Sequence, residues 1–232
     1  MTGHHETGCL ICGAPVVYTE PVRRRCAVCG KVFKADAVCE RGHFVCDACH
    51  AAGLPDYIKK MAASAEGDPI RLLETVFRQD GVHMHGPEHH AILPCALLVA
   101  YKNCGGDIDL AKAIPAALER GGKVPGGTCG YWGVCGAAAG AGIYASIVTG
   151  ATPLTDAVWT APQKLAAECI TAIARLGGVR CCKRTSFTAA IRAAEWTREV
   201  TGVELPVSRP VCSFYPKNRE CLGAACPYFP IK

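Results

Sequence analysis

Apolar positions recur at helical spacing through most of the chain beyond residue 68. Asp68-Pro69 provides an N-cap followed by proline at the first helical position, and Ile70 and Leu73 fall on one face of the helix that follows. Comparable start and stop signals predict further helices over about residues 86–103, 107–122, 134–149, 152–177 and 185–201. The alternation typical of strands is absent between residues 66 and 204. We therefore predict an all-α domain over residues 68–232 that ends in an irregular tail.

Two prolines and an aspartate refine the predicted helix boundaries. Pro94 should kink the 86–103 helix, because proline removes one backbone hydrogen bond. Pro162 should divide the segment that begins at Thr152-Pro153. Asp107 should cap the helix that follows it, since aspartate side chains accept hydrogen bonds from the first free amides of a helix.

A stretch of small residues stands out at the start of the 134–149 helix. Gly136 and Gly140 are four residues apart, so they share one helix face and leave it flat. Cys129 and Cys135 flank this face. It could receive an inorganic cluster, a substrate or another helix. The alternative is tight helix packing with two buried free thiols.

The cysteine content changes this picture most. The chain has 232 residues and 17 cysteines, and half of its residues are hydrophobic, which is enough for a core. The longest apolar run, Val134 to Val148, is short for a membrane span, and the first residues lack the pattern of a signal peptide. We therefore expect a soluble cytoplasmic protein whose thiols bind metal rather than form disulfides. The net charge of +5 counts cysteines as neutral, so it supports nucleic acid only weakly as a partner.

Residues 1–52 are predicted to form a small metal-binding module, which a linker over residues 53–67 joins to the helical domain. Seven cysteines but few large apolar residues lie in the module, so metal must supply much of its folding free energy. Soft ligands in Cys-x-x-Cys pairs favour zinc, and eight ligands fit two zinc ions. The eight predicted ligands are Cys9, Cys12, Cys26, Cys29, Cys39, His43, Cys46 and Cys49.

The pairing of these ligands has two solutions. In a sequential arrangement the first two Cys-x-x-Cys pairs form a zinc-ribbon site, and the ligands from Cys39 onward form the second site. The spacing from Cys26 to Cys49 also resembles the first six ligands of a RING finger. That resemblance implies a cross-brace, in which Cys26 and Cys29 pair with Cys46 and Cys49. Modules of either kind usually dock other molecules, so we expect a protein partner here, with nucleic acid as the less favoured choice.

Half of the chain's eight histidines fall within residues 83–90. Pro87 should place the residues after it in a first helical turn, where the helix dipole favours a carboxylate and a neutral imidazole. Neutral imidazole can accept a proton or bind metal. We predict an acid/base site here, and the alternative is structural hydrogen bonding near a helix end. The predicted catalytic residues, in order of preference, are Glu88, His89, His85 and His90.

The remaining cysteines predict a second metal site. Cys181 and Cys182 lie in a basic segment, and neighbouring Lys and Arg favour the thiolate form. Adjacent cysteines cannot readily both face one small ion, so we expect only one of them to ligate. With the three tail cysteines it would complete a [4Fe–4S] site; zinc is the alternative metal, and buried thiols without metal are the third interpretation. The candidate cofactor ligands are Cys129, Cys135, Cys181, Cys182, Cys212, Cys221 and Cys226.

Several motifs together resemble those of a prokaryotic family of unassigned function, domain of unknown function 5714. They are His85-Gly-Pro-Glu88-His89-His90, Pro125-Gly-Gly-x-Cys129-Gly-x-Trp132-Gly-x-Cys135-Gly, Arg180-Cys-Cys-Lys-Arg184 and Asn218-x-Glu220-Cys221-x4-Cys226-Pro. The resemblance covers nearly the whole chain. Members come mainly from anaerobic bacteria and archaea and sometimes accompany or fuse to radical SAM proteins. By that association, the resemblance implies iron–sulfur chemistry.

The leading interpretation is an iron–sulfur enzyme, or a redox or sulfur-transfer protein, with a zinc-bound docking module. Its substrate would be an unidentified small or sulfur-containing molecule. Two alternatives stay open: a non-enzymatic zinc-binding adaptor, and a thiol redox protein without a cluster. Metal content distinguishes the three, because only the first needs iron.

Overall fold

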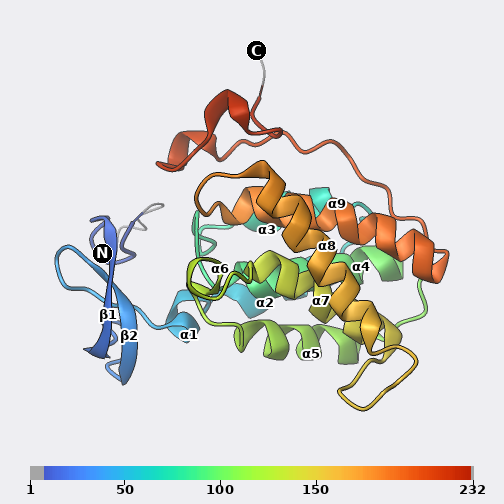
Figure 1. Ribbon diagram of the computed structural model, residues 1–232, viewed down its shortest axis with the longest axis horizontal. Helices are drawn as coiled ribbons and strands as arrows, with labels where there is room; N and C mark the ends of the chain where they lie inside the picture. Colours follow the sequence, from blue (N-terminus) through green and yellow to red (C-terminus); the bar gives the residue numbers. More distant parts are fainter. Residues whose placement is uncertain (1–7, 231–232) are drawn as a thin grey trace.

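The computed structural model describes residues 8–230, which form a small sheet module beside a larger body of helices (Figure 1). Residues 1–7 and 231–232 of the predicted domains lie outside the described residues. The module contains strands β1 (Val16–Arg25) and β2 (Val32–Cys39), drawn in blue at one end of the molecule. The short helix α1 (Asp47–His50) leads from the module into the body.

The two strands of the module form an antiparallel hairpin. The register pairs Val16 with Cys39 and Arg25 with Val32, and it is interrupted between Tyr18 and Val22. Most side chains of β1 are exposed, and β2 buries only the adjacent residues Val38 and Cys39, which point to opposite faces, so neither strand has a buried apolar face. Hydrophobic burial therefore stabilises this hairpin little, which agrees with the expectation that bound metal supplies much of its stability.

The body consists of helices, as predicted, and no strand occurs between residues 66 and 204. None of the helices in the described part of the chain is both long and apolar enough to cross a membrane. The helices are α2 (Leu54–Ala62), α3 (Pro69–Phe77), α4 (His89–Asn103), α5 (Leu110–Gly122), α6 (Thr128–Tyr131), α7 (Gly136–Thr149), α8 (Thr160–Leu176) and α9 (Cys182–Thr201).

Helix α4 lies at the centre of the body and contacts α2, α3, α5, α7 and α9. Every residue from His89 to Tyr101 is buried, as expected of a helix that is apolar on all sides. The flat face of α7 packs on it: Gly136 lies against the ring of His90, and Gly140 lies against Pro94. The sequence left a cluster, a substrate or another helix as possible neighbours of this face, and in the structure the neighbour is helix α4.

Three predicted boundaries are wrong. Asp109 rather than Asp107 caps α5, because its carboxylate accepts a hydrogen bond from the N–H two residues on, at 2.9 Å. No helix begins at Thr152-Pro153, since residues 152–159 form turns and α8 begins at Thr160. Pro162 does not divide a helix; it sits in the first turn of α8, where its missing N–H costs no hydrogen bond.

The tail beyond α9 is irregular, as predicted, but it packs on the body. Leu205, Phe214 and Tyr228 are buried, and the tail includes two 3-10 turns, η1 (Tyr215–Lys217) and η2 (Gly223–Ala225). The N–H of Cys212 donates to the carbonyl of Tyr228 at 2.7 Å, which closes the tail into a loop. In Figure 1 this loop, drawn in red, returns toward the start of α9.

Candidate functional site

The eight ligands predicted in the module form two compact groups. Within each group, one ligand atom from every residue lies within 4.8 Å of those of the others. The first group is Cys9, Cys12, Cys39 and His43, and the second is Cys26, Cys29, Cys46 and Cys49. The two groups are thus interleaved along the chain, as in a cross-brace, and the structure does not have the sequential pairing.

Backbone amides prepare these thiols to bind a cation. The N–H of His43 donates to Sγ of Cys39 at 3.2 Å, and the N–H of Cys46 donates to Sγ of Cys26 at 3.4 Å. In the first group, Nδ1 of His43 also lies 3.3 Å from Sγ of Cys12. Burial on its own would raise the pKa of Cys26, but amide donors outweigh it and lower this pKa to about 6. The same balance lowers the pKa of Cys39 to about 7. Each group therefore has one thiol whose pKa favours the thiolate near neutral pH, the form that binds metal, whereas burial raises the pKa of Cys9, Cys46 and Cys49.

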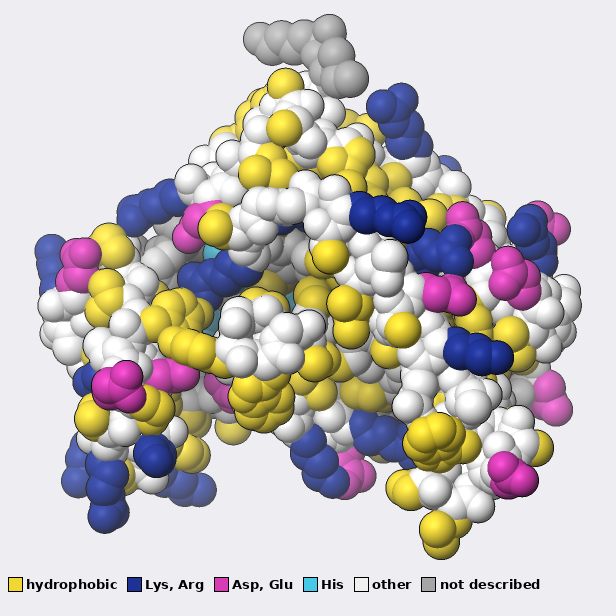
Figure 2. Space-filling view, viewed as in Figure 1, with side chains coloured by type: hydrophobic (Ala, Val, Ile, Leu, Met, Phe, Trp, Pro, Cys, Tyr) yellow, Lys and Arg dark blue, Asp and Glu magenta, His cyan; other side chains and the backbone are white. Residues whose placement is uncertain are grey.

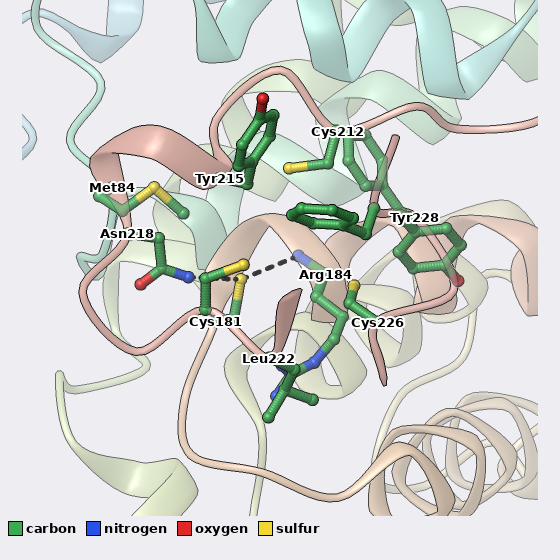
Figure 3. Close-up of a pocket in the computed structure, with 12 residues that line it drawn as sticks. Met84, Cys181, Arg184, Cys212, Tyr215, Asn218, Leu222, Cys226 and Tyr228 are labelled. Carbon is green, nitrogen blue, oxygen red and sulfur yellow. Dashed lines mark hydrogen bonds between the residues drawn. The ribbon is translucent and has the colours of Figure 1, made fainter. Parts of the chain in front are cut away.

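A second set of thiols meets in the body, where the start of α9 and the tail enclose a small cavity (Figure 3). Its volume is about 20 Å³, roughly the room for one water molecule, so it cannot take an organic substrate. All 17 cysteines of the chain are free thiols. Those in the lining of this cavity are Cys181, Cys212, Cys221 and Cys226.

Hydrogen-bond donors surround the sulfurs of this cavity. Cys181 is the N-cap of α9, and its Sγ accepts from the N–H of Arg184 and from Nδ2 of Asn218, both at 3.5 Å. The N–H of Gly223 donates to Sγ of Cys221 at 3.3 Å. Burial raises the pKa of Cys181, while the amide donors and the charge of Arg184 act in the opposite direction. The cavity thus combines soft ligands with groups that favour negative charge on sulfur.

A cleft of about 1270 Å³ lies between the module and the body. Figure 2 shows the surface hollowed between the two parts, with basic and histidine side chains inside the hollow. The body contributes residues 83–87, 90, 125–129, 131–132, 180 and 182, and the tail contributes Arg219 and Glu220. A volume of this size has room for a small organic ligand.

Three polar contacts hold the module against the body beside this cleft. Arg180 donates to the hydroxyl of Tyr18, the N–H of Gly126 donates to Oδ2 of Asp47 (3.0 Å), and Nδ1 of His50 lies 2.8 Å from Oε2 of Glu88. Each contact joins one residue of the module to one of the body. These contacts fix the module relative to the body on the two sides of the cleft.

The cleft and the cysteine cavity share a wall. Met84 lines both of them, and the neighbours Cys181 and Cys182 line the cavity and the cleft respectively. Asn218 connects the two sides, because its Oδ1 lies 3.2 Å from Nε2 of His85 while its Nδ2 donates to Sγ of Cys181. One layer of side chains thus separates the cavity from the cleft.

A family model described as a family of unknown function (DUF5714) matches residues 58–229. The chain belongs to this family. The DUF5714 region contains the whole cysteine cavity and the body's side of the cleft, whereas the eight ligands of the module precede it. No curated protein and no solved structure matches the chain.

Within the DUF5714 region, Glu88 and His89 are buried in a polar network and do not line the cleft. Besides its contact with His50, Glu88 accepts the N–H of His83 at 3.2 Å. Nδ1 of His89 donates to a backbone carbonyl (3.1 Å), so Nε2 accepts from Nζ of Lys183 at 2.8 Å. Burial and the charge of Lys183 keep the pKa of His89 well below its usual range, so the ring is neutral. Burial also lowers the pKa of Lys183, to about 8.

The other two predicted histidines do line the cleft. His90 donates from Nδ1 to the carbonyl of Val124 at 2.9 Å, which fixes its ring. Nε2 of His85 lies 3.2 Å from Oδ1 of Asn218 and 3.3 Å from Oε2 of Glu220. Of the four predicted catalytic residues, His85 is the one that contacts Asn218, and Asn218 also lines the cysteine cavity.

The structure brings together four of the seven predicted cofactor ligands. Cys129 and Cys182 line the cleft instead, and Cys135 is the N-cap of α7. Two residues that matter here, Lys183 and Asn218, lie in the sequence motifs quoted above but were not predicted as site residues. Lys183 stands 94 positions from His89, and Asn218 stands 133 positions from His85, so no local spacing connects either pair.

Proposed function

We propose that this DUF5714 protein is an iron–sulfur redox protein whose [4Fe–4S] cluster is held by Cys181, Cys212, Cys221 and Cys226. The observation that supports this is the convergence of these four free thiols on one cavity. Thiolates are the ligands of iron–sulfur clusters, and four of them complete a [4Fe–4S] site. The two groups in the module would each hold a zinc ion, for which Cys₃His and Cys₄ sets are typical.

The spread of the four sulfurs favours a cluster over a single ion. In the described part of the chain, no three of these four thiols lie within 4.8 Å of one another, unlike the ligands of the module. A single ion needs its thiolates that close, whereas each thiolate of a cluster binds a different iron. Since the cavity now encloses only about 20 Å³, a cluster would need the cysteine side chains to turn outward about their Cα–Cβ bonds.

The charges around the cavity suit such a cluster. Four thiolates give a [4Fe–4S] centre a net negative charge, which nearby cations and N–H donors stabilise. Arg184 lines the cavity, and Lys183 lies one position before it in the first turn of α9. The N–H donors to Cys181 and Cys221 are the kind of contact that adjusts the reduction potential of a cluster.

The number of thiols favours electron transfer over chemistry at an open iron. Four cysteines would occupy all four irons, whereas sulfur transfer needs an iron without a protein ligand. The wall that the cavity shares with the cleft, formed in part by Met84, supports a route for electrons to a molecule in the cleft. We therefore propose that the cleft holds the electron donor or acceptor.

Metal analysis of protein purified without oxygen tests this proposal. We expect about four irons and two zincs per chain, with broad absorption near about 400 nm that dithionite bleaches. Cys226→Ser should lose iron and keep zinc. Cys104→Ser changes a thiol outside all three sites and should keep both metals. A colourless protein that contains only zinc would instead favour the adaptor, and a metal-free body with a reactive thiol would favour the thiol redox protein.

A further inference from the structure

The cleft contains a histidine whose tautomer follows from its neighbours. Asn218 donates from Nδ2 to Sγ of Cys181, so its Oδ1 is the end that faces Nε2 of His85. The other neighbour of Nε2 is the carboxylate of Glu220. Because both neighbours are acceptors, Nε2 carries the hydrogen. Burial, together with the charge of Arg180, lowers the pKa of His85, so the ring is neutral and Nδ1 has a lone pair.

This lone pair has no partner in the described part of the protein. Nδ1 of His85 is buried without a hydrogen bond, and so is Oγ1 of Thr128. Both residues line the cleft, and Thr128 is only 3% exposed. A buried polar atom left without a partner costs about 1–3 kcal/mol. A ligand that donates to Nδ1 and also bonds to the Thr128 hydroxyl would remove that cost.

Two arginines make the body's side of the cleft favourable for an anion. Arg180 and Arg219 line it, and neither forms an ion pair with a carboxylate among residues 8–230. On that side Glu220 accepts a hydrogen bond from the neutral His85 and keeps its negative charge, so the body's side of the cleft has two cationic groups against one carboxylate. The remaining acidic residues of the cleft lie on the module, and they are Glu20, Asp36 and Asp47.

Aromatic rings supply an apolar surface in the same cleft. Tyr18 and Tyr131 line it and pack edge to face, with ring centroids 5.8 Å apart. Trp132 lines it too and is 66% exposed, so its face is free to pack on a ligand. Part of the ligand can therefore be apolar.

We propose that the cleft binds a small organic acid that also carries a hydroxyl group. Its acid group would pair with Arg180 and Arg219, its hydroxyl would donate to Nδ1 of His85, and its apolar part would pack on the aromatic rings. An amine would be a poorer donor to His85, because its positive charge would lie near Arg180. The proposal rests on the proposed function only in taking the cleft as the substrate site, and binding itself requires no iron.

Three matched compounds test this proposal by calorimetry on the full-length protein purified without oxygen. Mandelate has the acid, the hydroxyl and an aromatic ring; phenylacetate lacks the hydroxyl, and mandelamide lacks the charge. We expect mandelate to bind about tenfold more tightly than either. His85→Gln should abolish the advantage over phenylacetate, and Arg180→Gln the advantage over mandelamide. Arg209→Gln, which removes the same charge at an exposed site outside the cleft, should change neither ratio.

Equal affinities for the three compounds, or no binding of mandelate at millimolar concentration, would overturn the proposal. Thr128→Val is a second, nearly isosteric test, which should weaken mandelate and leave phenylacetate unchanged. Iron content measured on the same samples separates this result from the proposed function. Selective binding by iron-free protein would keep the cleft site and reject the cluster, whereas iron without selective binding would do the reverse.

Discussion

Nδ1 of His50, which directly follows the second metal group, lies 2.8 Å from Oε2 of the buried Glu88. On its other side the carboxylate adjoins His89, which accepts a hydrogen bond from Lys183. Gly86 permits the close approach, since a Cβ there would lie 2.1 Å from Oε2 of Glu88 and 2.3 Å from the ring of His50. The module, the polar network and the first turn of α9 are thus one connected set of contacts.

The charge of Glu88 should make the stability of the fold depend on pH. Burial on its own would raise the pKa of Glu88, but the hydrogen bond from His50, to which the neighbouring imidazoles of His89 and His50 add in the same direction, lowers it to about 2. The ionised carboxylate therefore stabilises the fold above its ordinary pKa of 4.5, and this stability is lost as the pH falls toward 2. We expect Glu88→Gln to lower the free energy of unfolding at pH 7 by on the order of 3 kcal/mol.

Urea titrations of wild type and Glu88→Gln at several pH values measure this effect. The difference between the two proteins should shrink below pH 4.5. Glu199→Gln changes an exposed carboxylate and should show no such trend. A stability of Glu88→Gln equal to wild type at pH 7 would show that the contact with His50 does not stabilise the fold.

The flat face of α7 should not tolerate even one methyl group at Gly136. Alanine is normally better than glycine in a helix by about 1 kcal/mol. Here its Cβ would lie 2.0 Å from the ring of His90, which is held by Val124, so we expect a net loss of about 1–3 kcal/mol. Thermal unfolding measures it. Gly122→Ala meets no atom within 4 Å and serves as the control; equal melting temperatures for the two variants would contradict the packing described here.

Loss of one ligand in the module should not affect the iron proposed for the body. Cys49→Ser removes a ligand of the second group, and we expect one zinc to be lost and the module to be destabilised. Iron should stay, because all four thiols of the cavity lie outside the module. Mass spectrometry of the metals in anaerobically purified protein measures both changes. Iron lost together with zinc would show that the cavity depends on the module.

Asn218 should adjust the reduction potential of the proposed cluster. Its Nδ2 donates to Sγ of Cys181, and such donors favour the reduced, more negative state. Asn218→Ala should therefore lower the midpoint potential, which a redox titration followed by electron paramagnetic resonance measures. Asn103→Ala removes an amide whose Nδ2 donates to the carbonyls of Ser64 and Glu66, outside the cavity, and it is the control. Identical potentials in the two variants would argue against a cluster beside Asn218.

The ligands of the module could be predicted as a set but not as pairs. Cys-x-x-Cys is a local pattern, so spacing alone identifies the residues. Pairing depends on the hairpin, whose register places Val16 opposite Cys39 and so carries the first ligands to Cys39 and His43. Neither strand buries an apolar face, so the sequence held no alternation from which to predict the hairpin.

In the body too, local sequence spacing predicted which residues take part in the site, but not which distant residues they contact. Because Cys181 and Cys182 are adjacent, the sequence predicts that only one of them faces the cavity. Which of the two it is depends on where α9 begins and on the tail that packs beside it. Histidine density predicted chemistry at residues 83–90, yet burial gave His89 a structural partner in Lys183. His85 reaches the cleft because a tail residue, Asn218, holds it there.

The interleaved ligands also set the order of events as the chain leaves the ribosome. The first metal group is complete only when His43 has emerged, and the second only when Cys49 follows a few residues later. With one ion in each group, as proposed, neither ion would be captured early by a stable half-module, so uptake of both would be nearly a single event. His50, which contacts the body, is the next residue in the chain. A protein made when metal is scarce would therefore lack the ordered module that forms one wall of the cleft.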